Sequence, residues 1–365
     1  MFKNYLVVAL RSFGKQKLNT FINVSGLAIG TACCLLLLLF VKNELSYDTF
    51  HENKDRLYRG WAKEVVGQQR TLFHTLTPFP FGDALKENFL EVEEVSLWLP
   101  VGWKLNVGDR QIPETVHLAS AGFFKMFSFP VAEGDVTRAL ESTNDIIITK
   151  SCAERYFGKE SAIGKTLSFI VDDKTFDFEV KVVVADPPTN SSLKFQFIVS
   201  EVLKKDLYEA RMLDSWFAIL GETYVLLREG TPLPDLEKKF PSLVERVVDV
   251  QQGDTYSIGL QPILDIHVNP EFPVGLASVT NPKYAYILGG IAALIVIIAC
   301  INFVTLSISQ SINRAKEVGM RKVAGAFRFQ LIQQYLSETI LLVIFGLLGG
   351  IMFAILALPP FNLLS

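Results

Sequence analysis

The sequence has 365 residues, of which 50% are hydrophobic, with a net charge of −3 and a mean hydropathy of +0.31. The charge is uneven: residues 1–19 hold four basic and no acidic residues, residues 42–283 hold 26 basic and 36 acidic residues, and residues 309–338 hold five basic and two acidic residues. An acidic central block without a basic stripe excludes a nucleic-acid-binding protein. Three apolar runs without charged residues exclude a chain that is water-soluble throughout, because about 20 such residues in a helix cross a bilayer.

The N-terminal segment, residues 1–19, predicts an amphipathic helix, because Phe2, Leu6, Leu10 and Phe13 recur at helical spacing. Such a helix lies in the cytoplasmic interface of a membrane. The alternative is a plain basic segment that only sets the topology. Residues 20–42 predict the first transmembrane helix. We expect it to be retained rather than removed as a signal peptide, because its apolar run is long and no small-residue cleavage site follows.

The central block, residues 43–283, mixes helical and strand periodicities, which indicates an α+β fold. Helices are expected at Phe81–Asn88 and Thr231–Val248. Strands are expected where β-branched and aromatic residues gather, at Asp145–Thr149, Thr166–Val171, Phe176–Ala185 and Thr223–Arg228. A stretch at about residues 145–212 is rich in such strands and predicts a separate, mainly β lobe. Only one of the four cysteines, Cys152, lies in the block, so no internal disulfide is expected there.

No stretch of the block predicts a catalytic, cofactor or metal site. Gly164-Lys165-Thr166 invites comparison with a phosphate-binding loop, but five residues rather than four separate Gly158 from Gly164. We therefore expect a turn before a strand. The histidines are too scattered for a zinc site and are expected to be surface or hydrogen-bonded residues: His51, His74, His117 and His267. The chain is accordingly predicted not to be an enzyme and to need no cofactor.

The C-terminal part predicts a second transmembrane helix at residues 284–308, a polar loop at residues 309–335, a third helix at residues 336–358 and a short end at residues 359–365. Because basic residues gather in cytoplasmic loops, the N-terminus and the polar loop are expected in the cytoplasm and the large block outside. Glu317 and Arg321 stand four apart, as in a short helix, and Gly325 is expected to end it. The alternative is a loop that only sets the topology.

Several stretches resemble the MacB/FtsX-type permeases of ABC transporters. The polar loop contains RAKEVGMRKVAGA (Arg314–Ala326), and the resemblance extends over nearly the whole chain through YLVVALRSFGKQKLNTFINVSGLAIG (Tyr5–Gly30), YDTFHENKDRLYR (Tyr47–Arg59), ITKSCAERYFGKESAIGKTL (Ile148–Leu167) and ADPPTNSSLKFQFIVS (Ala185–Ser200). The resemblance implies a MacB-like periplasmic core with a porter-like α/β lobe and an inserted mainly β lobe. It also implies an FtsX-like transmembrane domain with four spans. Three are found here, so we expect the N-terminal half or a fragment of a longer permease.

The resemblance also implies a role. The chain would be a non-catalytic permease subunit in the bacterial inner membrane, with a separate cytoplasmic ABC ATPase as partner and a second permease copy, as a homodimer or internal repeat. It would export or extract peptide, drug or lipoprotein cargo. The residues implied to couple it to the ATPase are Arg314, Glu317, Val318, Gly319, Arg321, Lys322 and Gly325. The alternatives are a membrane-anchored sensor or receptor that binds a ligand through its periplasmic domain, and an anchored extracellular enzyme.

Overall fold

The computed structural model divides into two units, a helical unit (Met1–Leu45 with Pro282–Ser365) and a sheet domain (Ser46–Asn281). It describes residues 13–14, 17–67, 70–137, 139–171, 174–249, 253–323 and 327–362. Most of the interfacial helix predicted for residues 1–19 lies outside these ranges, as does Gly325.

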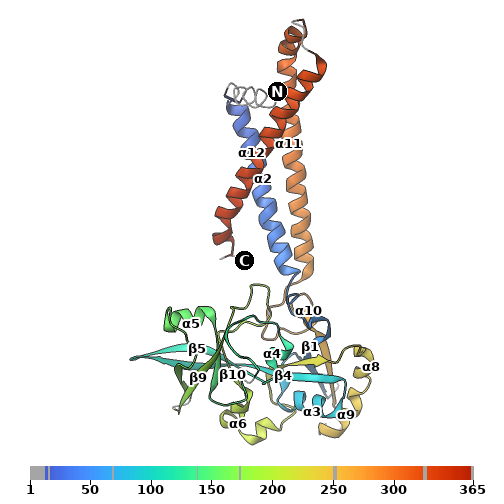
Figure 1. Cartoon of the computed structure of the whole chain (residues 1–365). Coiled ribbons are helices and arrows are strands. Elements are labelled where there is room, and N and C mark those ends of the chain that lie inside the picture. Colours follow the sequence, from blue (N-terminus) through green and yellow to red (C-terminus); the bar gives the residue numbers. More distant parts are fainter. Residues whose placement is uncertain are drawn as a thin grey trace. The chain divides into compact units, whose positions relative to one another are not determined.

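The helical unit consists of long apolar helices that run side by side (Figure 1). They are α2 (Lys17–Glu44), α11 (Pro282–Val323) and α12 (Arg328–Asn362). Among the described residues, three segments are long and apolar enough to cross a membrane: Thr20–Glu44, Pro282–Ser309 and Arg328–Phe361. The three predicted transmembrane helices are thereby confirmed.

Small residues let α2 approach both of the other helices closely. A Cβ atom added at Gly346 of α12 would lie 2.6 Å from Cδ2 of Leu27, and one at Gly350 would lie 2.6 Å from Cβ of Thr31. On the α11 side, a Cβ atom at Gly30 would lie 2.9 Å from Cβ of Ala299. Lipid tails are as apolar as leucine, so close packing of this kind is a main source of helix association in membranes.

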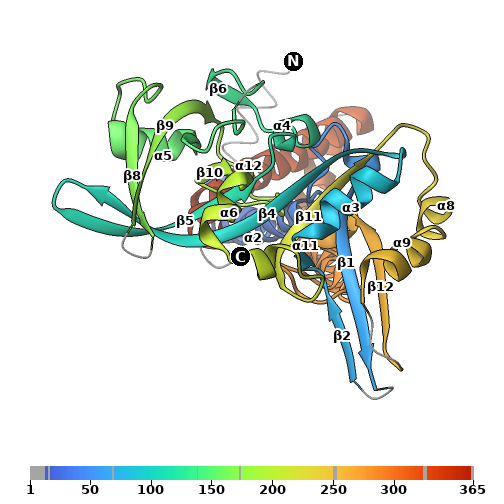
Figure 2. The same cartoon turned by 90° about the horizontal axis from the view of Figure 1, so that it is seen from below.

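The sheet domain is built on one sheet, which has twelve strands in the described residues (Figure 2). Nine of them follow one another in the order β12-β1-β11-β4-β5-β10-β7-β9-β6. The other three pair at its sides, β2 with β1, β3 with β11, and β8 with β4 and β9. The strands are β1 (Leu57–Val66), β2 (Arg70–His74), β3 (Thr77–Pro78), β4 (Val92–Val107), β5 (Arg110–Ala119), β6 (Val131–Gly134), β7 (Asp145–Thr149), β8 (Thr166–Val171), β9 (Lys174–Val184), β10 (Phe197–Ser200), β11 (Ile219–Leu227) and β12 (Thr255–Pro262). Most pairs are antiparallel, whereas β10 pairs parallel with β5 and β7 pairs parallel with β9.

Short helices connect or cover these strands. They are η1 (Lys54–Arg56), α3 (Pro80–Asn88), α4 (Phe123–Met126), α5 (Lys150–Phe157), η2 (Glu201–Leu203), α6 (Lys204–Leu207), α7 (Ala210–Leu213), α8 (Leu233–Glu237), α9 (Phe240–Val247) and α10 (Ile263–Ile266). The mixture of helices and strands confirms the α+β class. We expected a separate lobe at about residues 145–212, and this range holds strands β7 to β10. In the structure β10 pairs with β5 and β8 pairs with β4, so these strands are part of the same sheet as the rest of the domain.

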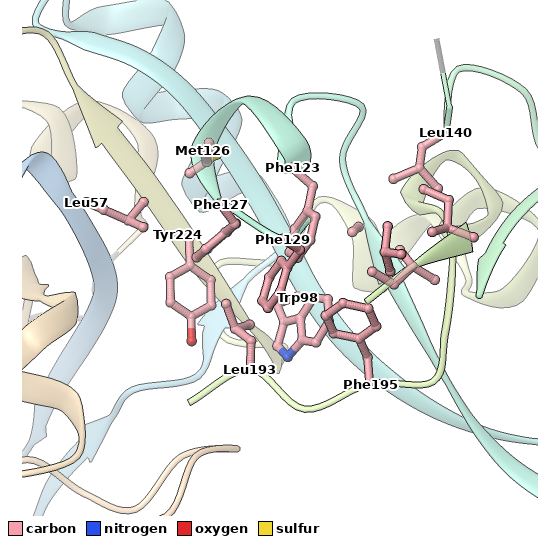
Figure 3. Close-up of a cluster of buried hydrophobic side chains, with 14 of the residues drawn as sticks. Leu57, Trp98, Phe123, Met126, Phe127, Phe129, Leu140, Leu193, Phe195 and Tyr224 are labelled. Atoms are coloured by element: carbon pink, nitrogen blue, oxygen red, sulfur yellow. The ribbon is translucent and has the colours of Figure 1, made fainter. Parts of the chain in front are cut away.

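Aromatic side chains make up much of the core at the centre of the sheet. The Trp98 ring stacks on the Phe123 ring, with centroids 5.2 Å apart. It also stacks on the His117 ring, with centroids 4.3 Å apart. Figure 3 shows Phe127, Phe129 and Phe195 gathered around the same cluster. The central strands β7 and β10 are buried along their whole length, which explains why they read as continuous apolar runs in the sequence.

Local predictions agree with the structure except where proline intervenes. The helix expected at Phe81–Asn88 is α3, and the four expected strands are β7, β8, β9 and β11. Gly164 lies in a turn with φ of 78° directly before β8, as predicted. The single helix expected at Thr231–Val248 is instead two, α8 and α9, because Pro241 lacks a backbone N–H and is placed in the first turn of a new helix.

Candidate functional site: the segments where the chain enters and leaves the sheet domain

The entry segment, residues 46–51, follows the first membrane helix and is fastened to the loop that precedes β10. The backbone N–H of Asp48 donates to the carbonyl of Asn190 (2.9 Å), and the Asn190 side chain donates back to the carbonyl of Ser46 (2.9 Å). The Asp48 carboxylate accepts from the backbone N–H of Ser192 (2.8 Å). Asp48 has a φ of 56°, a left-handed conformation that aspartate tolerates better than most residues. These bonds hold the entry segment to the body of the domain.

Two titratable groups are buried in this segment. Burial raises the pKa of Asp48 to about 6, although its hydrogen bonds with Ser192 act in the opposite direction. Burial lowers the pKa of His51 to about 4, so its ring is neutral at pH 7. The His51 Nδ1 atom accepts from the backbone N–H of Ser128 (3.1 Å), which places the ring proton on Nε2, 3.9 Å from the Asp48 carboxylate.

The exit segment, residues 272–281, precedes the second membrane helix and is linked to the entry segment through His267, which lies outside both segments. The Tyr47 and His267 rings stack with centroids 3.4 Å apart and planes inclined by 4°. Nδ1 of His267 donates to the carbonyl of Ser278 (2.9 Å), since a carbonyl can only accept, and the backbone N–H of Thr280 donates to the carbonyl of His267 (2.7 Å). His267 therefore links the two segments within the domain.

A buried carboxylate anchors the exit segment to the sheet. Glu222 of β11 pairs with Arg59 of β1 (2.8 Å) and accepts from the Tyr224 hydroxyl (2.7 Å). It also accepts from the backbone N–H of Leu276 in the exit segment (3.0 Å). Arg59 in turn donates to Gln261 of β12 (2.6 Å). Burial and the Glu222 charge hold the pKa of Tyr224 well above its usual range, so its hydroxyl remains a donor.

This arrangement suits the transmission of a displacement better than chemistry on a substrate. Both chain connections of the sheet domain are bonded to its buried interior, the entry segment through Asp48 and His51 and the exit segment through Glu222 and His267. A packed interior shifts as a unit rather than deforming continuously. Within the ranges that the structure describes, no group of three or more His, Cys, Asp or Glu side chains could hold a metal ion.

The predicted coupling residues lie at the end of α11. Arg314, Glu317, Val318, Gly319, Arg321 and Lys322 all fall within that helix, which continues from the membrane segment to Val323 without a break. Val318 is half-buried, and Gly319 and Lys322 are exposed. Gly325 lies outside the described residues. The segment was expected to form a short helix of its own, but its Ala, Glu, Lys, Arg and Met residues are strong helix formers that extend α11 instead.

Residue patterns gave a single weak indication of the buried groups of the sheet domain. Asp48, His51 and Arg59 all lie in the stretch Tyr47–Arg59, and Asn190 and Ser192 lie in Ala185–Ser200. Both stretches belong to the family resemblance described above, which assigned these residues no role. The structure brings them together through the bonds of Asp48 with Asn190 and Ser192. An acid and a histidine directly after a membrane helix were the one available signal.

The architecture is that of a membrane protein with a large domain inserted between its first two helices. The profile of the MacB-like periplasmic core domain matches residues 20–243, and that of the FtsX-like permease C-terminal domain matches residues 289–365. The chain therefore belongs to the MacB/FtsX-type permease family and carries a MacB-like periplasmic core domain, which confirms the family resemblance of the sequence.

Individual relatives are distant. A macrolide export ATP-binding/permease protein MacB from Bdellovibrio bacteriovorus is 24% identical over 143 residues, which are 37% of this chain and 21% of that protein. Among solved structures, a domain assigned to a permease protein of Porphyromonas gingivalis matches with a TM-score of 0.52 and 19% identity, over 65% of this chain and 98% of that one. The periplasmic region of MacB from Actinobacillus actinomycetemcomitans matches with a TM-score of 0.38 and 15% identity, over 55% of this chain and 87% of that one. The first of these structures supports the fold of the sheet domain, and the second is too dissimilar to add to it.

Proposed function

We propose that the chain is a non-catalytic permease subunit of an ABC transporter. In this proposal a separate cytoplasmic ATPase binds the end of α11, and the conformational change that ATP drives is passed through the membrane helices to the periplasmic core domain. The coupling residues are Arg314, Glu317, Val318, Gly319, Arg321, Lys322 and Gly325. The cargo is a peptide, a drug or a lipoprotein, which is exported or extracted.

The observation that carries the proposal is the continuity of α11. Its 42 residues correspond to roughly 60 Å of helix, about twice the thickness of the hydrocarbon layer. The apolar part, Pro282–Ser309, occupies its first two thirds, and the polar coupling sequence completes it. Because no break separates the two parts, a force on the polar end moves the residue that follows the sheet domain, Pro282.

The charge distribution supports the orientation. Basic residues dominate residues 1–19 and 309–338, whereas residues 42–283 are acidic. By the positive-inside rule, the N-terminus and the end of α11 lie in the cytoplasm of the bacterium, and the sheet domain lies in the periplasm on the other side of the inner membrane. A second permease copy would complete a symmetric transporter, because most oligomers of identical subunits are closed and symmetric.

The test is binding to, and stimulation of, a MacB-type ATPase. We expect Glu317→Lys to abolish co-purification of the ATPase and the permease-dependent part of its ATP hydrolysis, since it places like charge beside Arg321. Lys283→Glu, a charge reversal at the opposite end of the same helix, is the matched control and should leave both intact. Equal binding and equal hydrolysis for wild type and Glu317→Lys would exclude the proposed coupling segment.

A further inference from the structure

The exit segment presents an apolar tip to its surroundings. Val274 is 76% exposed and Leu276 is 40% exposed, and the stretch Phe272–Asn281 (FPVGLASVTN) contains no charged residue. Exposed apolar side chains are common singly, and two of them close together in an uncharged loop form a small apolar surface.

The tip is held rigidly from beneath. The backbone N–H of Leu276 donates to Glu222, and the Thr75 hydroxyl donates to the carbonyl of Pro273 (3.4 Å). Gly275 lies directly on the buried ion pair: a Cβ atom there would be 2.3 Å from Oε1 of Glu222 and 2.9 Å from NH1 of Arg59. The backbone between Val274 and Leu276 is thus fixed, and ordering the loop costs nothing further when it binds.

The length of chain to the membrane limits where this tip can be. Only five residues separate Leu276 from Pro282, at which α11 begins, so roughly 20 Å is the farthest that Leu276 can lie from that point. The first five residues of α11 include two exposed tyrosines, Tyr284 (63%) and Tyr286 (69%). Tyrosines gather at the level of the lipid headgroups, which places the start of α11 at the interface.

We propose that Val274 and Leu276 insert into the interfacial layer of the bilayer beside the point where α11 enters it. The sheet domain then rests on the lipid through a preformed apolar tip in addition to its two chain connections. Such a contact sets the tilt of the domain against the membrane. A tip tethered within a few residues of the bilayer needs little intrinsic affinity, because its effective concentration at the surface is high.

A lipid surface is favoured over a protein partner by the chemistry of the loop. Protein interfaces carry a polar rim with hydrogen-bonding and charged groups around their apolar centre. The exit segment offers no charge over ten consecutive residues, and two of its backbone groups are bonded inside the domain: the Ser278 carbonyl accepts from Nδ1 of His267, and the Thr280 N–H donates to the His267 carbonyl. An interfacial layer accepts short apolar side chains without such complementarity.

The experiment is site-directed spin labelling of the full chain in phospholipid nanodiscs. Cys33, Cys34 and Cys300 are replaced by alanine, and Cys152 is retained because it is buried and burial raises the pKa of its thiol to about 12, which leaves it unreactive. A nitroxide is attached at Val274→Cys. The matched control is Leu90→Cys, an 87% exposed leucine in the loop between α3 and β4 of the same domain.

We measure how often the label collides with oxygen, which concentrates in lipid, and with a nickel chelate, which stays in water. The ratio of the two collision rates reports whether the label lies in lipid or in water. We expect the oxygen-to-nickel ratio at position 274 to exceed that at position 90 several-fold. A ratio at 274 equal to that at 90 would place the tip in water and overturn the proposal. Protection of position 274 from both reagents would also overturn it, since a protein partner would then cover the tip. The measurement needs no ATPase, so its outcome is independent of the proposed function.

Discussion

Arg59 and Glu222 form an ion pair with no more than 1% of either side chain exposed, between strands that are far apart in the sequence. The pair is completed by Tyr224 and Gln261 and receives the backbone N–H of Leu276. A buried ion pair stabilises a fold weakly in itself, but removing one partner leaves an uncompensated charge in the interior. The arrangement ties the exit segment to the most buried part of the sheet.

The first prediction concerns this pair. Glu222→Gln should lower the free energy of unfolding of the sheet domain by roughly 3–5 kcal/mol, because Arg59 then remains charged and buried without its counter-ion. Thermal or denaturant unfolding of the protein measures the change. Glu160→Gln, which removes an exposed partner of Lys165, is the control and should leave unfolding unaltered. Equal behaviour of the two variants would show that the buried pair is not the anchor described above.

A second prediction tests the close packing over the pair. Gly275→Ala places a Cβ atom within 3 Å of Glu222, Thr75 and Arg59, which are hydrogen-bonded and cannot move aside. We expect a loss of roughly 1–3 kcal/mol in the free energy of unfolding. Gly102→Ala in β4, where nothing lies within 4 Å of the added atom, should be neutral or slightly stabilising. Unchanged stability of Gly275→Ala would mean that the exit segment is free to shift.

The pH dependence of stability gives a third prediction. The pKa of Asp48 rises from 3.8 to about 6 on folding, so the folded state binds the proton more tightly. The stability that this protonation supplies is present below about pH 4 and is lost as the pH rises through 6, an effect of roughly 3 kcal/mol. Asp48→Asn, which mimics the protonated group, should therefore gain stability relative to wild type between pH 4 and pH 7.

His51 and His117 act in the opposite sense, since burial lowers both pKa values to about 4 and stability is lost as the pH falls from 6.5 to 4. Both residues are present in wild type and in Asp48→Asn, so the contribution of His117 cancels in the difference between the two melting curves, which reports Asp48 together with its neighbour His51, 3.9 Å away. A difference that stays constant from pH 4 to pH 7 would contradict a buried, proton-binding Asp48.

A fourth prediction concerns the membrane helices. Gly350→Leu should separate α2 from α12, because even a Cβ atom at that position would lie 2.6 Å from Cβ of Thr31 and 2.9 Å from the carbonyl oxygen of Ala28. We expect a lower thermal midpoint in detergent for the helical unit. Gly289→Leu in α11, where nothing lies within 4 Å, is the control. Loss of stability in the control alone would show that the α2–α12 contact is misassigned.

Those parts of the fold that depend on local pattern could be predicted from the sequence. The three membrane helices follow from apolar runs, and strands such as Asp145–Thr149 follow from β-branched residues. Contacts between distant residues could not be predicted. Arg59 and Glu222 are 163 positions apart, and neither periodicity nor spacing relates them. His51 and His267 were expected to be surface or hydrogen-bonded histidines, and both are hydrogen-bonded, but only the fold shows that they lie beside Asp48 and Tyr47. The polar residues 309–335 were expected to form a loop with a short helix, and the extension of α11 to Val323 follows from their helix-forming residues.

The most direct test of the account is hydrogen exchange in the complex with the ATPase, compared between the nucleotide-free and ATP-bound states. Amide exchange in residues 46–51 and 276–281 should change when ATP binds, because displacement of α2 and α11 strains the bonds of Asp48, His267 and Leu276. The change should vanish in Glu317→Lys. Identical exchange in the two nucleotide states of the wild-type complex would contradict the transmission of motion to the sheet domain.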